Sequence, residues 1–137
     1  MHNCAFQALE IDAQYLAFDV APANLEAALA GARALGIRQL AVSLPHKVSV
    51  MEYLDEVDPV ARQIGAVNTI TRDGERLVGA NTDWRGVIKA LEAETALSGA
   101  RAVVLGSGGT ARAVVYGLQQ RGAEVSILNR TEARAQE

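Results

Sequence analysis

A glycine-rich turn in the last third of the chain has the residue types and spacing to bind phosphate. Residues 103–113 read VVLGSGGTARA, and Gly106, Gly108 and Ala111 fit the dinucleotide-binding pattern G-x-G-x-x-G/A. The first glycine permits a tight turn, the second admits a pyrophosphate close to the backbone, and the third small residue lets helix and strand pack closely. The start of the next helix would add free N–H groups and partial positive charge. We therefore expect a nucleotide cofactor at Gly106, Ser107, Gly108, Gly109, Thr110 and Ala111.

The same glycine pattern also fits a plain tight turn between a strand and a helix, so its neighbours decide between the two interpretations. The continuous apolar run at 101–106 predicts a buried strand, 110–122 a helix that ends at Gly122, and 123–129 a second strand. This strand–turn–helix–strand order favours the cofactor site.

The residues after the second strand favour NADP over NAD. An NAD site usually has an acidic residue there, which accepts hydrogen bonds from the ribose 2′-hydroxyl. Here the chain reads Asn129-Arg130-Thr131, and the first carboxylate is Glu132 in the next predicted helix. A guanidinium can bind a 2′-phosphate and stack on adenine, although a single arginine is also an ordinary surface charge. We expect Asn129, Arg130 and Thr131 to contact NADP.

Three polar clusters stand beside or inside apolar strands earlier in the chain: SLPHK at 43–47, Asn68-Thr69, and NTD at 81–83. Each has a simple structural explanation, namely a surface lysine, the outward face of a hairpin, and a helix cap. However, ligands of parallel α/β sheets lie at the carboxyl ends of the strands. Three such clusters ahead of a phosphate turn therefore favour a substrate site that includes Lys47 and Asp83.

The periodicity of the remaining sequence predicts the elements that would hold these residues. Asp73-Gly74, between two β-prone runs at 66–81, predicts a hairpin, and Ser98-Gly99 is the best domain boundary. The fold class expected is α/β, with a mainly parallel sheet in a domain at 1–98 followed by the start of a Rossmann-type domain at 99–137. The other expected elements are helices at 3–10, 24–36, 48–55, 59–64, 84–97 and 131–137, and strands at 15–20 and 37–43.

Composition restricts the class of protein. Of 137 residues, 50% are hydrophobic and 21% charged, as in soluble globular proteins. There is no apolar run of the ~20 residues that a membrane span needs, and the N-terminus lacks a signal-peptide pattern. Cys4 is the only cysteine, and the net charge is −3. We expect a cytoplasmic protein that has no metal site and binds neither nucleic acid nor membrane.

Six stretches in order resemble the shikimate dehydrogenase family and cover the chain almost end to end. They are MHNCAFQALEID, VSLPHK, GAVNT, NTDWRG, GSGGTARA and NRTEARA, beginning at residues 1, 42, 65, 81, 106 and 129. The resemblance implies NADP-dependent interconversion of 3-dehydroshikimate and shikimate, a step of aromatic amino-acid biosynthesis.

The resemblance also implies roles for individual residues. Lys47 and Asp83 would form the catalytic pair, and the substrate would be bound by Ser43, Lys47, Asn68 and Asp83, with Ser43 in place of the more usual threonine. These roles are chemically sensible. Nicotinamide supplies hydride to a ketone carbon, and an ammonium group can stabilise the developing alkoxide and give it a proton. His46 is expected to be a neighbour of this site and not to act in it.

Two alternatives to this activity stay open. Trp84 stands where the family often has glycine, so the substrate could instead be quinate or an aminated analogue. A non-catalytic module on the same fold is a further alternative, although the retention of Lys47 and Asp83 weighs against it.

The family pattern begins before Met1 and continues past Glu137, which predicts that these residues alone are not a competent enzyme. Homodimer formation stays open.

Overall fold

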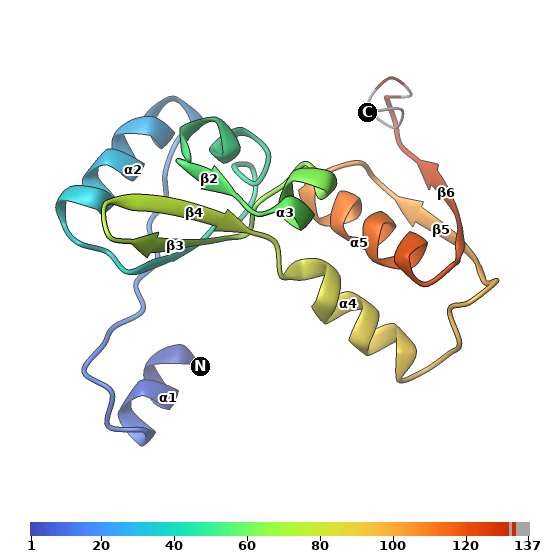
Figure 1. Ribbon diagram of the computed structural model, residues 1–137, viewed down its shortest axis with the longest axis horizontal. Coiled ribbons are helices and arrows are strands. Elements are labelled where there is room, and N and C mark those ends of the chain that lie inside the picture. The colour runs from blue at the N-terminus through green and yellow to red at the C-terminus, as the bar shows by residue number, and fades with distance from the viewer. Residues whose placement is uncertain (132, 134–137) are drawn as a thin grey trace.

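The computed structural model describes residues 1–131 and 133, so the expected helix at 131–137 lies almost entirely outside the described residues. Figure 1 shows two separate sheets with helices between them, and an N-terminal arm that extends away from both. The first sheet carries four strands and the second carries two.

The N-terminal arm consists of helix α1 (His2–Ala8) and a chain that leads to the short 3-10 helix η1 (Pro22–Asn24). The strand expected at 15–20 is wrong, because residues 15–19 are exposed and the segment pairs with no described strand. The Asn3 side chain instead binds the backbone of Tyr15, accepting from its N–H at 2.6 Å and donating to its carbonyl at 3.0 Å. A β-prone sequence forms a strand only where a neighbour supplies ladder hydrogen bonds.

The first sheet is mixed. Its order is β1-β3-β4-β2; β1 and β4 are both antiparallel to β3, and β2 is parallel to β4. The hairpin expected around Asp73-Gly74 is confirmed, with Gly74 at a φ of 62° that favours glycine. The α/β class is confirmed, but the sheet is not mainly parallel, since a hairpin forces antiparallel pairing. The bounds are β1 Gln39–Ala41, β2 Glu56–Val57, β3 Thr69–Asp73 and β4 Arg76–Ala80.

One face of this sheet packs against α2 (Leu25–Ala34) and the 3-10 helix η2 (Ser49–Tyr53). Helix α3 (Pro59–Ile64) begins where the Asp58 side chain accepts from the Ala61 N–H at 2.9 Å, and it ends at Gly65, whose φ is 70°. The buried residues of this core are Leu25, Leu29, Val50, Ala61, Val67, Ile70 and Leu77.

The second sheet pairs β5 (Arg101–Leu105) in parallel with β6 (Glu124–Leu128), joined by α5 (Gly109–Gln120). Helix α4 (Asp83–Glu92), shorter than expected, packs against α5. A Cβ at Gly117 would overlap Ile88, so this glycine permits the close approach of the two helices.

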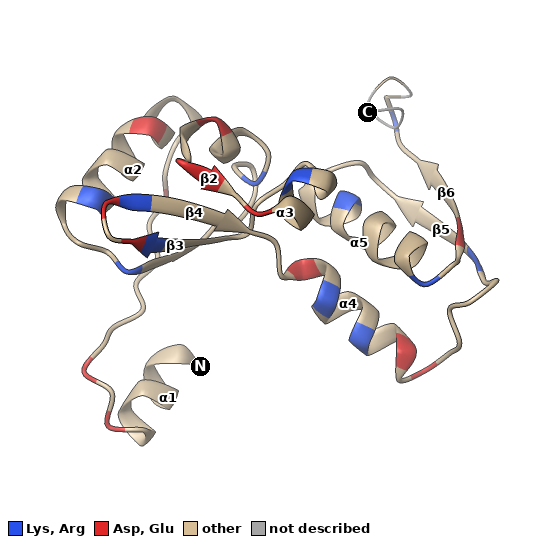
Figure 2. Ribbon diagram, viewed as in Figure 1, with Lys and Arg blue, Asp and Glu red and all other residues tan. Residues whose placement is uncertain are grey.

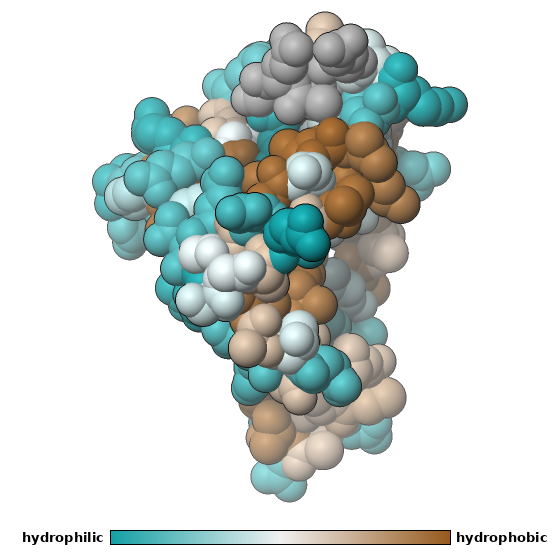
Figure 3. All heavy atoms as spheres, turned by 90° about the vertical axis from the view of Figure 1, so that its right-hand side faces the viewer, coloured by the Kyte–Doolittle hydropathy of each residue, from teal (hydrophilic) through white to brown (hydrophobic). Residues whose placement is uncertain are grey.

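The expected burial of the strand at 101–106 is wrong. Val103 is 61% exposed and Leu105 is 78% exposed, because the packing described for this sheet involves only the face toward α5. Figure 3, which looks onto the side of the molecule that bears β5 and β6, shows apolar side chains gathered there.

Charged residues of both signs are distributed over both sheets and their helices, as Figure 2 shows. Within residues 1–131 and 133, no helix has the length and apolar character needed to cross a membrane. The same residues contain no group of three or more potential metal ligands.

Candidate active site

The loop after β1 presents Lys47 at the junction of the two sheets. The Val42 N–H donates to the Asn68 carbonyl at 2.7 Å, and the Val67 N–H donates to the Lys47 carbonyl at 2.7 Å. Both ends of the loop are thereby fixed to the segment that enters β3. The Lys47 side chain is only 12% exposed.

Lys47 and Asp83 form an ion pair, with Nζ 2.6 Å from Oδ2. Asp83 is the first residue of α4, and its backbone N–H donates to Asn81 Oδ1 at 3.0 Å. Asn81 is itself buried and donates to the Ala66 carbonyl at 2.9 Å. Two residues 36 positions apart in the sequence are therefore in contact at strand ends, as their placement predicts.

Asn68 holds the second oxygen of the carboxylate. Its Nδ2 donates to Asp83 Oδ1 at 2.7 Å and to Thr82 Oγ1 at 2.9 Å. Its Oδ1 accepts from the Thr82 N–H and from the Thr69 hydroxyl, both at 2.9 Å. Asn68 is therefore part of a network around Asp83 and not the outward face of a hairpin. Thr82, the N-cap residue of α4, makes no side-chain cap bond.

Thr110 is a contact of Lys47 that sequence reasoning missed, having assigned it to the cofactor alone. Its Oγ1 accepts from Lys47 Nζ at 3.1 Å. The neighbouring Gly109 lies so close that a Cβ there would be 2.8 Å from the Lys47 Cβ. No local pattern links positions 47 and 110, because the contact depends on how the two sheets are placed.

Ser43 and His46 lie in the same loop but outside the ion-pair network. Ser43 is exposed, and its carbonyl accepts from the His46 N–H at 3.0 Å. The His46 Nε2 contacts the Val20 carbonyl at 2.7 Å, which ties the loop to the chain before η1. Among the described residues, the hydroxyl of Ser43 contacts neither Lys47 nor Asp83.

Trp84 packs against helices α3 and α5, although it directly follows Asp83 in the sequence. Its ring meets Tyr116 edge-on at 5.4 Å between centroids, and it contacts the buried cluster that contains Ile64 and Ala113. The Arg85 guanidinium lies 5.3 Å from the ring centroid. Trp84 thus fills the junction of α3, α4 and α5.

The glycine-rich turn has the shape that a dinucleotide phosphate requires. Gly106 has a φ of 103°, and a Cβ at Gly106 or at Gly108 would meet nothing within 4 Å. Open space therefore lies beside both glycines, and Gly108 directly precedes the first turn of α5. After β6, Asn129 donates to the Thr131 carbonyl at 2.9 Å, and Arg130 is exposed. These residues fit a nucleotide cofactor.

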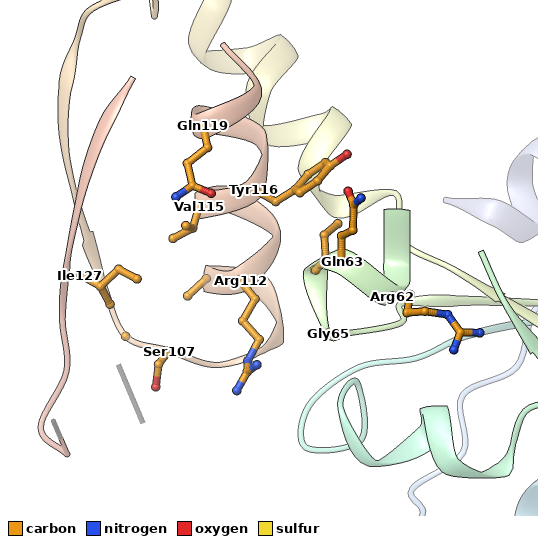
Figure 4. A pocket seen from close by; sticks show the side chains of 12 residues that line it. Arg62, Gln63, Gly65, Ser107, Arg112, Val115, Tyr116, Gln119 and Ile127 are labelled. Carbon is orange, nitrogen blue, oxygen red and sulfur yellow. The ribbon is translucent and has the colours of Figure 1, made fainter. Parts of the chain in front are cut away.

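A groove of about 410 Å³ runs from this turn along α5 toward α3 (Figure 4). Figure 4 shows Ser107 and Arg112 at one end and Gln119 at the other. A Cβ at Gly65 would lie 3.2 Å from the Arg112 guanidinium, so this side chain connects α5 to the end of α3. Lys47 and Asp83 do not line this groove.

Together the fold and the site define an α/β protein in which a mixed sheet with a lysine–aspartate pair precedes the strand–turn–helix–strand unit of a Rossmann-type fold. Residues 1–70, just over half of the 137, match the family described as "Shikimate dehydrogenase substrate binding domain". The chain belongs to the shikimate dehydrogenase family.

Individual relatives agree with this assignment. A "Shikimate dehydrogenase (NADP(+))" of Symbiobacterium thermophilum is 52% identical over 138 residues, which is 99% of this chain and 47% of the relative. The crystal structure of shikimate dehydrogenase from Aquifex aeolicus matches with a TM-score of 0.93 and 37% identity, over 98% of this chain and 51% of that one. The chain thus spans about half the length of these relatives.

A solved structure with another activity has the same fold. The 5-ketofructose reductase of a Gluconobacter strain matches with a TM-score of 0.83 and 38% identity, over 98% of this chain and 49% of that one.

Proposed function

We propose that the protein carrying this chain catalyses the reversible, NADP-dependent reduction of 3-dehydroshikimate to shikimate. The observation that carries the proposal is the Lys47–Asp83 ion pair at 2.6 Å, placed directly against the helix that follows the dinucleotide turn. Membership of the shikimate dehydrogenase family and the NADP-linked relative support the choice of substrate and cofactor.

Lys47 handles the proton in this proposal. The bound cofactor supplies hydride to the ketone carbon. The Lys47 ammonium donates a hydrogen bond to the ketone oxygen, stabilises the negative charge that develops there, and transfers the proton. Asp83 keeps the ammonium in position through Oδ2, and Asn68 keeps Asp83 in position through Oδ1.

Substrate hydroxyls are bound by Ser43, Asn68 and Asp83 in this proposal. Ser43 is exposed and ready to do so. Both N–H donors of Asn68 already have acceptors, in Thr82 and Asp83, so Asn68 donates to substrate only by releasing one of them.

NADP is held in two places. Its phosphates lie at the turn from Gly106 to Ala111, where glycines leave space beside the start of α5. Arg130 binds the 2′-phosphate, together with Asn129 and Thr131, because its guanidinium is exposed just after β6. We accordingly divide the chain into a substrate-binding part at 1–98 and a nucleotide-binding part at 99–137.

The second candidate is reduction of a different polyhydroxylated ketone by the same Lys47–Asp83 pair. The similarity to a 5-ketofructose reductase and the serine at position 43 favour it. Quinate and aminated shikimate analogues belong to this candidate. A purely binding module is less well supported, because binding alone does not need a proton donor such as Lys47 held in place by Asp83 and Thr110.

The test is a substrate and cofactor comparison on the complete gene product that carries these residues. We expect the kcat/KM for oxidation of shikimate with NADP to be higher than the kcat/KM for quinate or for the alcohol form of a keto sugar. We also expect NADP to be preferred to NAD. Faster oxidation of quinate or of the alcohol form of a keto sugar would favour the second candidate. If none of the three substrates is oxidised, a binding module is favoured.

A further inference from the structure

We propose that Thr110 is a positioning residue for Lys47, so that the turn that receives the cofactor also sets the direction of the ammonium group. This inference rests on the proposed function of Lys47 as proton donor. It differs from the role expected from the sequence, in which Thr110 contacts the cofactor only.

The first observation is how Lys47 uses its hydrogen-bond donors. A lysine ammonium has three N–H donors and no acceptor. One is directed to Asp83 Oδ2 at 2.6 Å and a second to Thr110 Oγ1 at 3.1 Å. With two directions fixed, the third N–H has a defined direction in which to meet a substrate oxygen.

The second observation is the close packing of the first turn of α5 on the stem of Lys47. A Cβ at Gly109 would lie 2.8 Å from the Lys47 Cβ and 3.2 Å from the Ala66 Cβ. The Lys47 side chain therefore lies between Asp83 on one side and the start of α5 on the other. A shift of the phosphate-binding turn necessarily changes the surroundings of the ammonium.

Thr110 is suited to link the two sites because it offers two groups in two directions. Its hydroxyl accepts from Lys47 and can still donate its own proton. Its backbone N–H is in the first turn of α5, where N–H groups have no partner within the helix and face an incoming phosphate. A valine at this position would keep the shape and the N–H and remove the acceptor.

Chemical labelling of the two lysines tests the contact without any need for activity. The chain contains only Lys47 and Lys89, and Lys89 is exposed on α4. In the complete gene product, reductive methylation followed by peptide mass spectrometry gives the labelling rate of Lys47 relative to Lys89. We expect Thr110→Val to raise this ratio about tenfold, the order expected for loss of a hydrogen bond to a charged group. Thr110→Ser should restore it.

Kinetics and cofactor binding distinguish positioning from cofactor contact. For Thr110→Val we expect kcat with shikimate and NADP to fall about tenfold. The KM for shikimate and the calorimetric Kd for NADP should change less than about twofold, and Thr110→Ser should recover kcat. The matched control is Ser107→Ala in the same turn, which should weaken NADP binding and leave the Lys47 labelling ratio unchanged.

Two results would overturn the proposal. One is an unchanged Lys47 labelling ratio in Thr110→Val and in the smaller Thr110→Ala, because the hydrogen bond would then not restrain the ammonium. The other is a loss of NADP affinity as large as the loss of kcat, which would return Thr110 to a cofactor-only role. If the wild-type protein does not oxidise shikimate at all, the proposed function fails, while the labelling ratios still decide whether Thr110 holds Lys47.

Discussion

The region around the Lys47–Asp83 ion pair and the glycine-rich turn differ in whether their polar groups already have partners within the chain. Around Asp83 each carboxylate oxygen has a donor from the chain itself, Lys47 for one and Asn68 for the other. At the turn, by contrast, a Cβ at Gly106 or Gly108 would meet only open space, and Arg130 is exposed. One region holds its charges in place without a ligand, and the other leaves space where we propose that the phosphates of a cofactor bind.

The difference fits the role that we propose for each region. A group that acts in a transition state is most effective when its direction is fixed in advance, so that no reorganisation is needed during the reaction. A phosphate site instead needs backbone N–H groups that are exposed until the phosphate binds. Activity should therefore depend strongly on single side chains of the first region. Ligand affinity at the second region should depend on the negative charge of the ligand.

The largest expected effect is at Lys47. In the complete gene product, Lys47→Ala should lower kcat for shikimate oxidation by about 100- to 10,000-fold, the range for loss of a general acid–base, with little change in KM. Lys89→Ala, on the exposed side of α4, is the matched control and should retain activity. A change mainly in KM would show that Lys47 binds substrate and does not transfer the proton.

Arg130 tests the second region. Arg130→Ala should weaken NADP binding about ten- to a hundredfold, because charge-assisted hydrogen bonds to the 2′-phosphate are lost, and should leave NAD binding within about twofold. Titration calorimetry with each cofactor measures this directly. Equal losses for NADP and NAD would mean that Arg130 does not contact the 2′-phosphate.

Gly117 tests the contact between α4 and α5 that joins the two regions. Gly117→Ala should lower the free energy of unfolding by about 1–3 kcal/mol, since the new methyl group overlaps Ile88. Gly86→Ala on α4 is the control: a Cβ there meets nothing within 4 Å, and the change should stabilise by about 0.5–1 kcal/mol. Urea unfolding measures the free energy of unfolding of both variants. If Gly117→Ala stabilised the protein as much as Gly86→Ala does, close packing at Gly117 would be refuted.

The smallest effect is expected at Asp55, a carboxylate that is paired in the manner of Asp83 but serves folding. The Leu77 N–H, 2.6 Å away, and the Arg33 guanidinium, 2.7 Å away, lower the pKa of Asp55 below its usual value. Its contribution to stability is therefore complete above the usual aspartate pKa and is lost as the pH falls through the lowered folded-state pKa.

Replacing Asp55 by asparagine should remove part of the dependence of stability on pH in the acid range. Urea midpoints measured at a series of acid pH values should decline less steeply for Asp55→Asn than for the unchanged chain. Parallel declines would show that the two hydrogen-bonded contacts do not favour the charged form.

Local signals in the sequence predict the glycine-rich turn, the hairpin and the contact between Lys47 and Asp83. The glycine spacing from Gly106 to Ala111 indicates the turn, and Asp73-Gly74 indicates the hairpin, because each depends on backbone conformations that few residues adopt. Lys47 and Asp83 could be paired because both follow strands that end at the same edge. The resemblance to the shikimate dehydrogenase family assigns expected roles to these residues.

What could not be predicted depends on distant partners. The segment 15–20 has strand-like residues but lacks a neighbouring strand, and β5 has an apolar sequence but is half exposed. Trp84 follows Asp83 in sequence yet points into the junction of α3, α4 and α5. Burial and long-range contacts are properties of the assembled fold, so local propensity and periodicity do not predict them.

The position of Trp84 makes it an optical probe of this junction. It is the only tryptophan of the chain, and it lies against Tyr116, one of three tyrosines. Its emission spectrum depends on the polarity of its surroundings, and its excitation by energy transfer depends on its distance from Tyr116. A shift of α5 against α4 when NADP or substrate binds would therefore change tryptophan fluorescence. The junction between the two candidate binding regions thus carries its own spectroscopic label.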